Sequence, residues 1–103
     1  MLAIINNGNP CICNDYGSIM TRLYPNGARC VCMSPNQKYL VAGFDDGARV
    51  FSLPYGSLQC IITSIHGPVC AISFRDEQSF AISYSKGGGS IYNVNGGQLA
   101  CFI

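Results

Sequence analysis

The sequence contains no tryptophan, a single histidine and few charged residues, since only 11% of its 103 residues are Asp, Glu, Lys or Arg. Six Lys and Arg oppose five Asp and Glu, which leaves a net charge of +1, and no basic run is present. Because nucleic-acid binding draws on many phosphate contacts, this charge argues against a nucleic-acid partner.

Long apolar runs and a secretory leader are also missing. The apolar runs, of which the longest lies around residues 60–62, are too short to cross a bilayer. The first ten residues lack the positive region and the continuous apolar region of a secretory signal. We therefore expect a cytoplasmic protein without direct membrane insertion.

The composition favours a small all-β domain. Nearly half of the residues (49%) are apolar, and 12 Gly and five Pro supply many turns. The length suits one small domain and is too short for two. Seven cysteines are an odd number for a disulfide framework, and in a reducing compartment free cysteine behaves as a small buried hydrophobe.

Residues 39–51 predict the hairpin around which the chain is organised. Residues 39–43 form an apolar run, Asp45-Asp46-Gly47 a turn, and residues 48–51 the return strand. Asp-Gly between two such runs is a strong hairpin signal, because glycine adopts a positive φ at little cost. Residues 79–92 repeat this pattern, and residues 2–13 repeat it more loosely.

The chain is therefore a repeat with a period of about 40 residues. The pairs that show it are Cys30 with Cys70, Val50 with Ile91, and Tyr16-Gly17 with Tyr55-Gly56. Four strands recurring at this interval predict the blades of a β-propeller. We expect an incomplete first blade over residues 1–26 and further blades over residues 27–66 and 67–103, about two and a half four-stranded antiparallel blades in all.

Residues 27–103 resemble the WD-repeat family. Ser34-Pro35-Asn36 matches the first turn of such a repeat and Asp45-Asp46-Gly47 the second, while Phe51-Ser52 and Tyr92-Asn93 stand where Trp-Asp would. The resemblance implies an all-β, partial WD-repeat-like β-propeller that acts as a protein-interaction scaffold without catalysis. Without tryptophan, only His66 and Asp45 or Asp46 are candidates for the family's buried His, Ser, Asp and Trp network.

A narrower resemblance is to the N-terminal propeller of the vacuolar protein sorting-associated protein 8 family. The residues that carry it are Gly43-Phe44, Ile61-Ile62-Thr63, His66-Gly67, Ile72, Phe74-Arg75-Asp76, Ala81-Ile82 and Gly88-Gly89-Ser90. It implies a role in the CORVET tethering complex on endosomal membranes, with an early-endosomal Rab GTPase and tethering-complex subunits as partners. Members of that family also carry a long helical region and a RING-type zinc domain, so we expect this chain to be a fragment.

Four cysteines raise the question of a metal site. Cys11 and Cys13, with Cys30 and Cys32, could supply four thiolates to zinc. Structural zinc usually takes two cysteines separated by two residues at a turn, so we favour cysteines in the strand core and expect no metal or other cofactor.

Three further groups of residues resemble catalytic or phosphate-binding elements. His66 and Cys70 lie too close in sequence on a turn and strand to face each other, and no third residue orients the imidazole. Lys86 precedes its glycines and a strand follows, which favours a hairpin turn over a phosphate loop. The remaining candidates are carboxylates in expected loops, which we interpret as solvated and not as catalytic: Asp45, Asp46, Asp76 and Glu77.

Aromatic residues and Arg75 are candidates for contact with a partner, because such residues supply much of the energy of protein interfaces. Tyr16 and Tyr55 occupy equivalent turns, so we favour rings that pack on their own blades. For Tyr24, Tyr92 and Arg75 we likewise assign no contact with a partner.

Three functions remain open at this point. The first is the interaction scaffold, and the second is an enzyme, which would need polar groups around the propeller axis. The third is a structural remnant without a partner. Because an open arc of blades exposes two flanks, we expect the chain to belong to a longer protein or to assemble with copies of itself.

Overall fold

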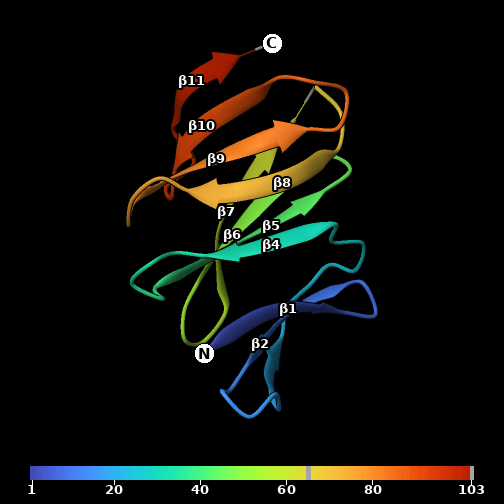
Figure 1. Ribbon diagram of the computed structural model, residues 1–103, viewed down its shortest axis with the longest axis vertical. Coiled ribbons are helices and arrows are strands. Elements are labelled where there is room, and N and C mark those ends of the chain that lie inside the picture. The colour runs from blue at the N-terminus through green and yellow to red at the C-terminus, as the bar shows by residue number, and fades with distance from the viewer. Residues whose placement is uncertain (65, 103) are drawn as a thin grey trace.

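The computed structural model describes residues 1–64 and 66–102, which form eleven strands and no helix. These strands make three antiparallel sheets that follow one another along the longest axis of the molecule (Figure 1). The first sheet contains β1 (Leu2–Asn6), β2 (Asn9–Cys13) and β3 (Ile19–Arg22). The second contains β4 (Cys30–Met33), β5 (Tyr39–Phe44), β6 (Gly47–Ser52) and β7 (Ser57–Thr63). The third contains β8 (Val69–Phe74), β9 (Ser79–Tyr84), β10 (Gly89–Asn93) and β11 (Gln98–Phe102).

The hairpin expected over residues 39–51 is confirmed as β5 and β6. Its register runs from Tyr39 opposite Ser52 to Phe44 opposite Gly47. Gly47 has a φ of 141°, and a Cβ at this position would collide with the carbonyl oxygen of Ile62 on β7. Glycine is therefore required by both the turn and the neighbouring strand.

The two central strands of the second sheet, β5 and β6, are buried on both faces, whereas antiparallel sheets commonly have one face in solvent. On one face, Leu40 and Phe44 belong to an apolar cluster with Ile12 of the first sheet. On the other, Val41 and Phe80 belong to a cluster shared with the third sheet. Successive residues of β5 thus support two separate cores, because side chains alternate along a strand.

The second and third sheets approach each other closely at Gly43. A Cβ on Gly43 would lie 2.6 Å from Cys30 Sγ and 2.7 Å from Val69 Cγ1. Further along the junction, Gln59 Nε2 on β7 donates hydrogen bonds to the Val94 carbonyl at 3.2 Å and to Asn95 Oδ1 at 3.0 Å. The sheets are therefore joined by close packing near one edge and by side-chain hydrogen bonds near the other.

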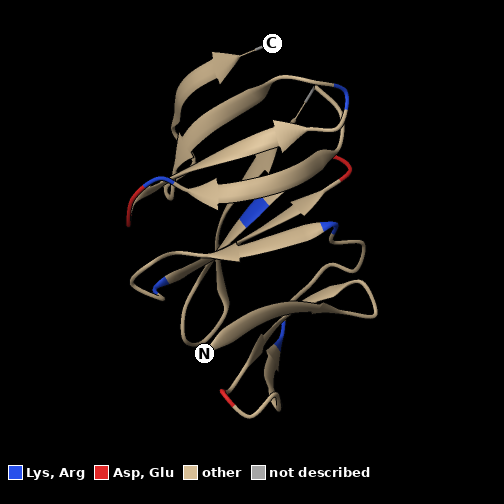
Figure 2. Cartoon of the chain, viewed as in Figure 1, with Lys and Arg blue, Asp and Glu red and all other residues tan. Residues whose placement is uncertain are grey.

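The third sheet leaves Ser83 and Phe102 exposed on the face turned away from the second sheet, whereas β2 in the first sheet is buried along its whole length. The molecule is elongated, with extents of 39 × 26 × 18 Å. The few charged residues lie mostly at turns and strand ends, so most of the sheet surface carries no charge (Figure 2). The described part of the chain has no helix with the length and hydrophobicity needed to cross a membrane.

Candidate functional site

A pocket of about 270 Å³ lies where the first sheet meets the second. Residues 25–27, in the connection between the two sheets, form one wall. The other wall comes from the β5–β6 hairpin and consists of Phe44, Asp45, Asp46 and Arg49. The pocket therefore combines an apolar ring, two carboxylates and a guanidinium within one opening.

Arg49 is the chemically distinctive residue of this pocket. Its guanidinium carbon lies 5.8 Å from the centre of the Phe44 ring, which is the distance range of a cation–π interaction. Phe44 is 4% exposed, whereas Arg49 is partly buried. Among residues 1–64 and 66–102, Arg49 makes no hydrogen bond or ion pair through its side chain. Its donors are thus available to an anion from outside the chain.

The mouth of the pocket is shaped by a turn and a surface ion pair. Asp45 Oδ1 accepts from Arg29 Nε, and both side chains are largely exposed. The Asp46 carbonyl accepts from Ser64 N at 2.9 Å, which fixes the hairpin turn against the end of β7. Tyr24, which precedes the pocket wall, is 68% exposed. A partner can therefore reach both the Tyr24 ring and the pocket.

The sequence does not point to Arg49 as a site residue, and it marks Phe44 only as part of the narrower family resemblance. The available signal was a cationic residue in the middle of the apolar return strand, between Ala48 and Val50. Alternation alone places Arg49 on the same face as Phe51, but the pocket also requires the connection at residues 25–27. Strand periodicity does not predict this contact between the sheets.

The four cysteines considered as zinc ligands lie in pairs on β2 and β4. Cys11 and Cys13 are buried at 0% and 1% exposure, as expected for core cysteines. Cys30 and Cys32 share a face, because they lie opposite Gly43 and Val41 of β5. Burial raises the pKa of the Cys30 thiol above its ordinary value of 9.0. Within the described ranges, no three His, Cys, Asp or Glu side chains lie close enough together to hold a metal ion.

The cysteine nearest to the His66 imidazole nitrogen is Cys101 and not Cys70, which the sequence suggested. The His66 Nε2 lies 4.0 Å from Cys101 Sγ, and the His66 ring centre lies 5.2 Å from that of Tyr84. Ser90 Oγ donates to Cys101 Sγ at 3.4 Å. The sulfur–nitrogen distance is at the outer limit of a hydrogen bond, and within the described chain no carboxylate bonds the imidazole. This geometry lacks the oriented base of a nucleophilic site.

Asp45 does not take part in a buried network with His66. The expectation that it could is wrong, because its carboxylate bonds Arg29 at the surface and is 70% exposed. At the positions expected for Trp-Asp, Phe51 is 3% exposed and Tyr92 is 8% exposed. Tyr92 packs on Phe80 and its hydroxyl donates to Gln98 Oε1 at 3.1 Å. Aromatic packing at these positions is retained without the indole.

The expectation that Tyr16 and Tyr55 pack on their own sheets is wrong. Their side chains are 96% and 86% exposed, because the turns that carry them extend beyond the ends of the sheets. Gly56, the residue after Tyr55, instead lies against Leu23, the residue that follows β3 of the first sheet. The turn therefore joins two sheets through its glycine and leaves its tyrosine in solvent.

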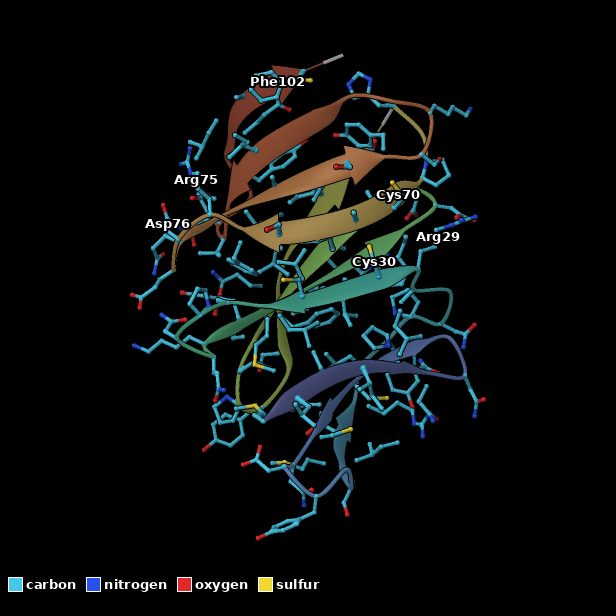
Figure 3. All side chains as sticks on the ribbon, in the orientation of Figure 1. Arg29, Cys30, Cys70, Arg75, Asp76 and Phe102 are labelled. Atoms are coloured by element: carbon cyan, nitrogen blue, oxygen red, sulfur yellow. The ribbon has the colours of Figure 1, made fainter. Side chains whose placement is uncertain are left out.

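The remaining candidates have structural roles. Lys86 lies in the β9–β10 connection, where Gly87 N donates to the Tyr84 carbonyl at 3.0 Å, so the hairpin interpretation is confirmed. Arg75 Nε donates to Ser79 Oγ at 3.1 Å, inside the β8–β9 turn. Figure 3 shows this turn on the opposite side of the molecule from Arg29.

Comparisons with known proteins identify the fold. No protein family model and no curated protein matches the sequence. Solved structures share its fold across nearly the whole chain, among them the two that follow. The crystal structure of a eukaryotic initiation factor matches 91% of the chain at 13% identity, with a TM-score of 0.71. The C-terminal WD40 domain of Sif2 matches 93% at 16% identity, with a TM-score of 0.72. The chain has the fold of a partial WD40 β-propeller.

The expected fold class is thereby confirmed, and each sheet is one blade of the propeller. The first blade has three strands and the other two have four. The chain spans 26% of the initiation factor and 31% of the Sif2 domain, so it corresponds to about a third of such a propeller or less. These comparisons give no support to the narrower resemblance to the vacuolar sorting family.

Proposed function

We propose that the chain is a non-catalytic protein-interaction scaffold whose partner binds over the pocket between the first and second blades. The observation that carries this proposal is Arg49, a partly buried guanidinium that lies over Phe44 without a counterion among the described residues. Arginines held in this way are frequent energetic centres of protein interfaces. The exposed ring of Tyr24 extends the same surface.

The chemistry of the pocket favours an acidic side chain of the partner. A carboxylate can accept two hydrogen bonds from one guanidinium, and such pairs are stronger in partly desolvated surroundings. Arg29 forms an ion pair with Asp45. The charge of Asp45 therefore repels an incoming acidic group less strongly than the charge of an unpaired carboxylate would. Asp46, beside it, adds a preference for a partner with a cationic residue next to the acidic one.

The partner proposed for this surface is an early-endosomal Rab GTPase, within endosomal tethering and protein sorting. Support for this finer step comes from the sequence resemblance of residues 43–90 alone. The proposed site of action is the cytoplasm, with peripheral attachment to endosomal membranes through the partner.

The site is tested with two peptides that differ only in Glu against Gln. Nuclear magnetic resonance titration of the labelled chain should give shifts around residues 25–27 and 44–49 with the Glu peptide only. Arg49→Met removes the charge and keeps the length of the side chain, so it should abolish the response. Arg75→Met is the matched control, since Arg75 lies in a distant turn. Equal responses to both peptides, or an unchanged Arg49→Met variant, would contradict the proposed site.

The GTPase is tested separately by capture on the immobilised chain. GTP-loaded early-endosomal Rab should bind the wild-type chain and the Arg75→Met variant, but not Arg49→Met. The GDP-loaded form and an unrelated GTPase serve as controls. Absence of binding by the wild-type chain removes the Rab assignment, whereas binding that survives Arg49→Met removes the assigned surface.

A further inference from the structure

Two cysteines lie on either side of the junction between the second and third blades. Cys30 begins β4 and Cys70 is the second residue of β8, and these are the first strands of their blades. The two strands contact each other, and Figure 3 shows the two labelled side chains one above the other on them. Because Cys30 and Cys70 occupy equivalent positions of successive repeats, the fold brings them to the same level of the propeller.

The Cys30 sulfur lies close to the backbone that carries Cys70. Cys30 Sγ is 3.9 Å from the Val69 carbonyl oxygen. That oxygen belongs to the peptide unit that joins Val69 to Cys70, so standard bond dimensions place Cys30 Sγ within roughly 7 Å of Cys70 Cα. The remaining separation is short enough for rotation of the two side chains, with a small adjustment of the strands, to bring the sulfurs into bonding distance.

A bulge in β8 directs Cys70 toward this junction. The register of β8 against β9 shifts between Val69 and Ala71, so Cys70 is the extra residue of the bulge. Val69 is fully buried in the core shared with the second blade, and Ile72 packs against the same core. Side chains two positions apart share a strand face, so Cys70 lies on the face of Ile72. The bulge therefore turns two successive residues, Val69 and Cys70, toward the second blade.

The two thiols differ in accessibility and in acidity. Cys70 is exposed, whereas Cys30 is partly buried. Burial raises the pKa of the Cys30 thiol, and a charge on Cys70 raises it further, since two nearby thiolates repel each other. A small oxidant therefore meets Cys70 first and finds Cys30 beside it. An accessible thiol with a second thiol within reach is the arrangement found in cysteines that are oxidised reversibly.

We propose that Cys30 and Cys70 form a reversible disulfide that joins the second blade to the third when the chain meets hydrogen peroxide. The Cys70 thiolate attacks one peroxide oxygen, the O–O bond breaks, and a sulfenic acid forms while hydroxide leaves and takes up a proton. The Cys30 thiolate then attacks the Cys70 sulfur, the S–S bond forms, and the sulfenic oxygen leaves as water. The two thiols lose two electrons and two protons in all, and the peroxide becomes two waters. Glutathione reverses the bridge by thiol–disulfide exchange and leaves as its own disulfide.

The bridge should stabilise the folded chain. A disulfide acts mainly by restricting the unfolded chain, and this effect grows with the length of the loop that it closes. The loop between Cys30 and Cys70 contains the whole of β5, β6 and β7, so the second blade lies within it. We expect the oxidised chain to unfold at a temperature higher by roughly 5 °C or more than the reduced chain.

The test treats the folded chain with hydrogen peroxide, blocks the remaining thiols and digests the product with trypsin without reductant. In the double variant Cys32→Ser, Cys60→Ser, the tryptic peptides 30–38 and 50–75 contain one cysteine each. Mass spectrometry should find these two peptides joined. They should form at least about tenfold faster than in urea, where no fold holds the two thiols together. Mixed isotope-labelled and unlabelled chains show whether the joined peptides come from one chain.

Three single variants complete the test, with thermal unfolding before and after oxidation as the second measurement. Cys30→Ser and Cys70→Ser should each lose the joined peptides and the rise in unfolding temperature. Cys101→Ser removes the other exposed cysteine and should keep both.

Several results would overturn the proposal. One is a bridge from Cys70 to Cys32 or Cys101 in the wild-type chain, located by peptide fragmentation. Others are joined peptides that combine labelled with unlabelled chains, equal rates in the folded and unfolded chain, or oxidation of Cys70 to sulfinic acid without a bridge. None of these variants alters Arg49, so the outcome is independent of the proposed partner site.

Discussion

Gly43 and Val69 lie so close that a Cβ on Gly43 would come within 2.7 Å of Val69 Cγ1, at the junction of the second and third blades. The position cannot hold a larger residue without moving one blade away from the other. We expect Gly43→Ala to destabilise the chain by about 1–3 kcal/mol, as overpacking does in other cores. Urea unfolding followed by circular dichroism measures this change.

Ser83 provides the matched control for Gly43. It stands at the equivalent position of the third blade, where no blade follows in the structure and the residue is exposed. Ser83→Ala should change the free energy of unfolding by no more than about 0.5 kcal/mol. Equal effects of the two substitutions would mean that the junction at Gly43 is not tightly packed.

The Asp76 carboxylate in the turn between β8 and β9 should make the stability of the chain depend on pH. Hydrogen bonds from Gln78 N, then from Ser79 Oγ, hold the pKa of the Asp76 carboxyl below its ordinary value of 3.8. Because the folded-state pKa is lowered, the contribution to stability is complete above the unfolded value and is lost as the pH falls through the folded value.

Asp76→Asn tests this contribution through the midpoint of thermal unfolding. At pH 7 the variant should unfold at a lower temperature than the wild-type chain. The difference should shrink below pH 4 and disappear when Asp76 is protonated in both states. A difference that stays constant down to pH 2 would show that the carboxylate charge is not what stabilises the turn.

The cysteines should react with an alkylating reagent in an order set by burial. Cys70 and Cys101 are exposed and should react first, whereas Cys11 and Cys13 should react only after unfolding. Cys30 should react at intermediate rates and require a higher pH than a cysteine in a short peptide, because burial raises its pKa. Mass spectrometry of peptides from a timed reaction gives each rate. Reaction of Cys11 as fast as Cys70 would contradict the core of the first blade.

Arg49 should matter for binding and little for stability. Its guanidinium has no counterion in the described chain, so Arg49→Met should change the free energy of unfolding by less than about 1 kcal/mol. Denaturant unfolding of the variant used in the peptide titration measures this directly. A loss of several kcal/mol would assign Arg49 a structural role and weaken the proposed site.

The strands and hairpins could be predicted because their signals are local. Asp45-Asp46-Gly47 and the apolar runs around it specify a turn and two strands within about a dozen residues. The approach of His66 to Cys101, and the pocket around Arg49, could not be predicted. Both depend on contacts between strands or sheets that are distant in sequence, and these follow from the twist and stacking of blades.

The tyrosine turns illustrate the same limit. Tyr16-Gly17 and Tyr55-Gly56 recur at the repeat interval, and this recurrence predicts that both rings pack on their own blades. In the structure it is the glycine of the second turn that contacts the neighbouring blade, at Leu23. Repetition identifies an equivalent position correctly, but it does not say which of two adjacent residues makes the contact.

The central claim is that the second blade lies between the other two, with a separate apolar core on each of its faces. Nuclear Overhauser effects between methyl and aromatic protons of the labelled chain test it most directly. The account predicts proximity within the cluster of Ile12 with Leu40 and within the cluster of Val41 with Phe80. It predicts no contact between Ile12 and Phe80. Strong effects joining Ile12 directly to Phe80 would show a single shared core and would contradict the arrangement of three stacked blades.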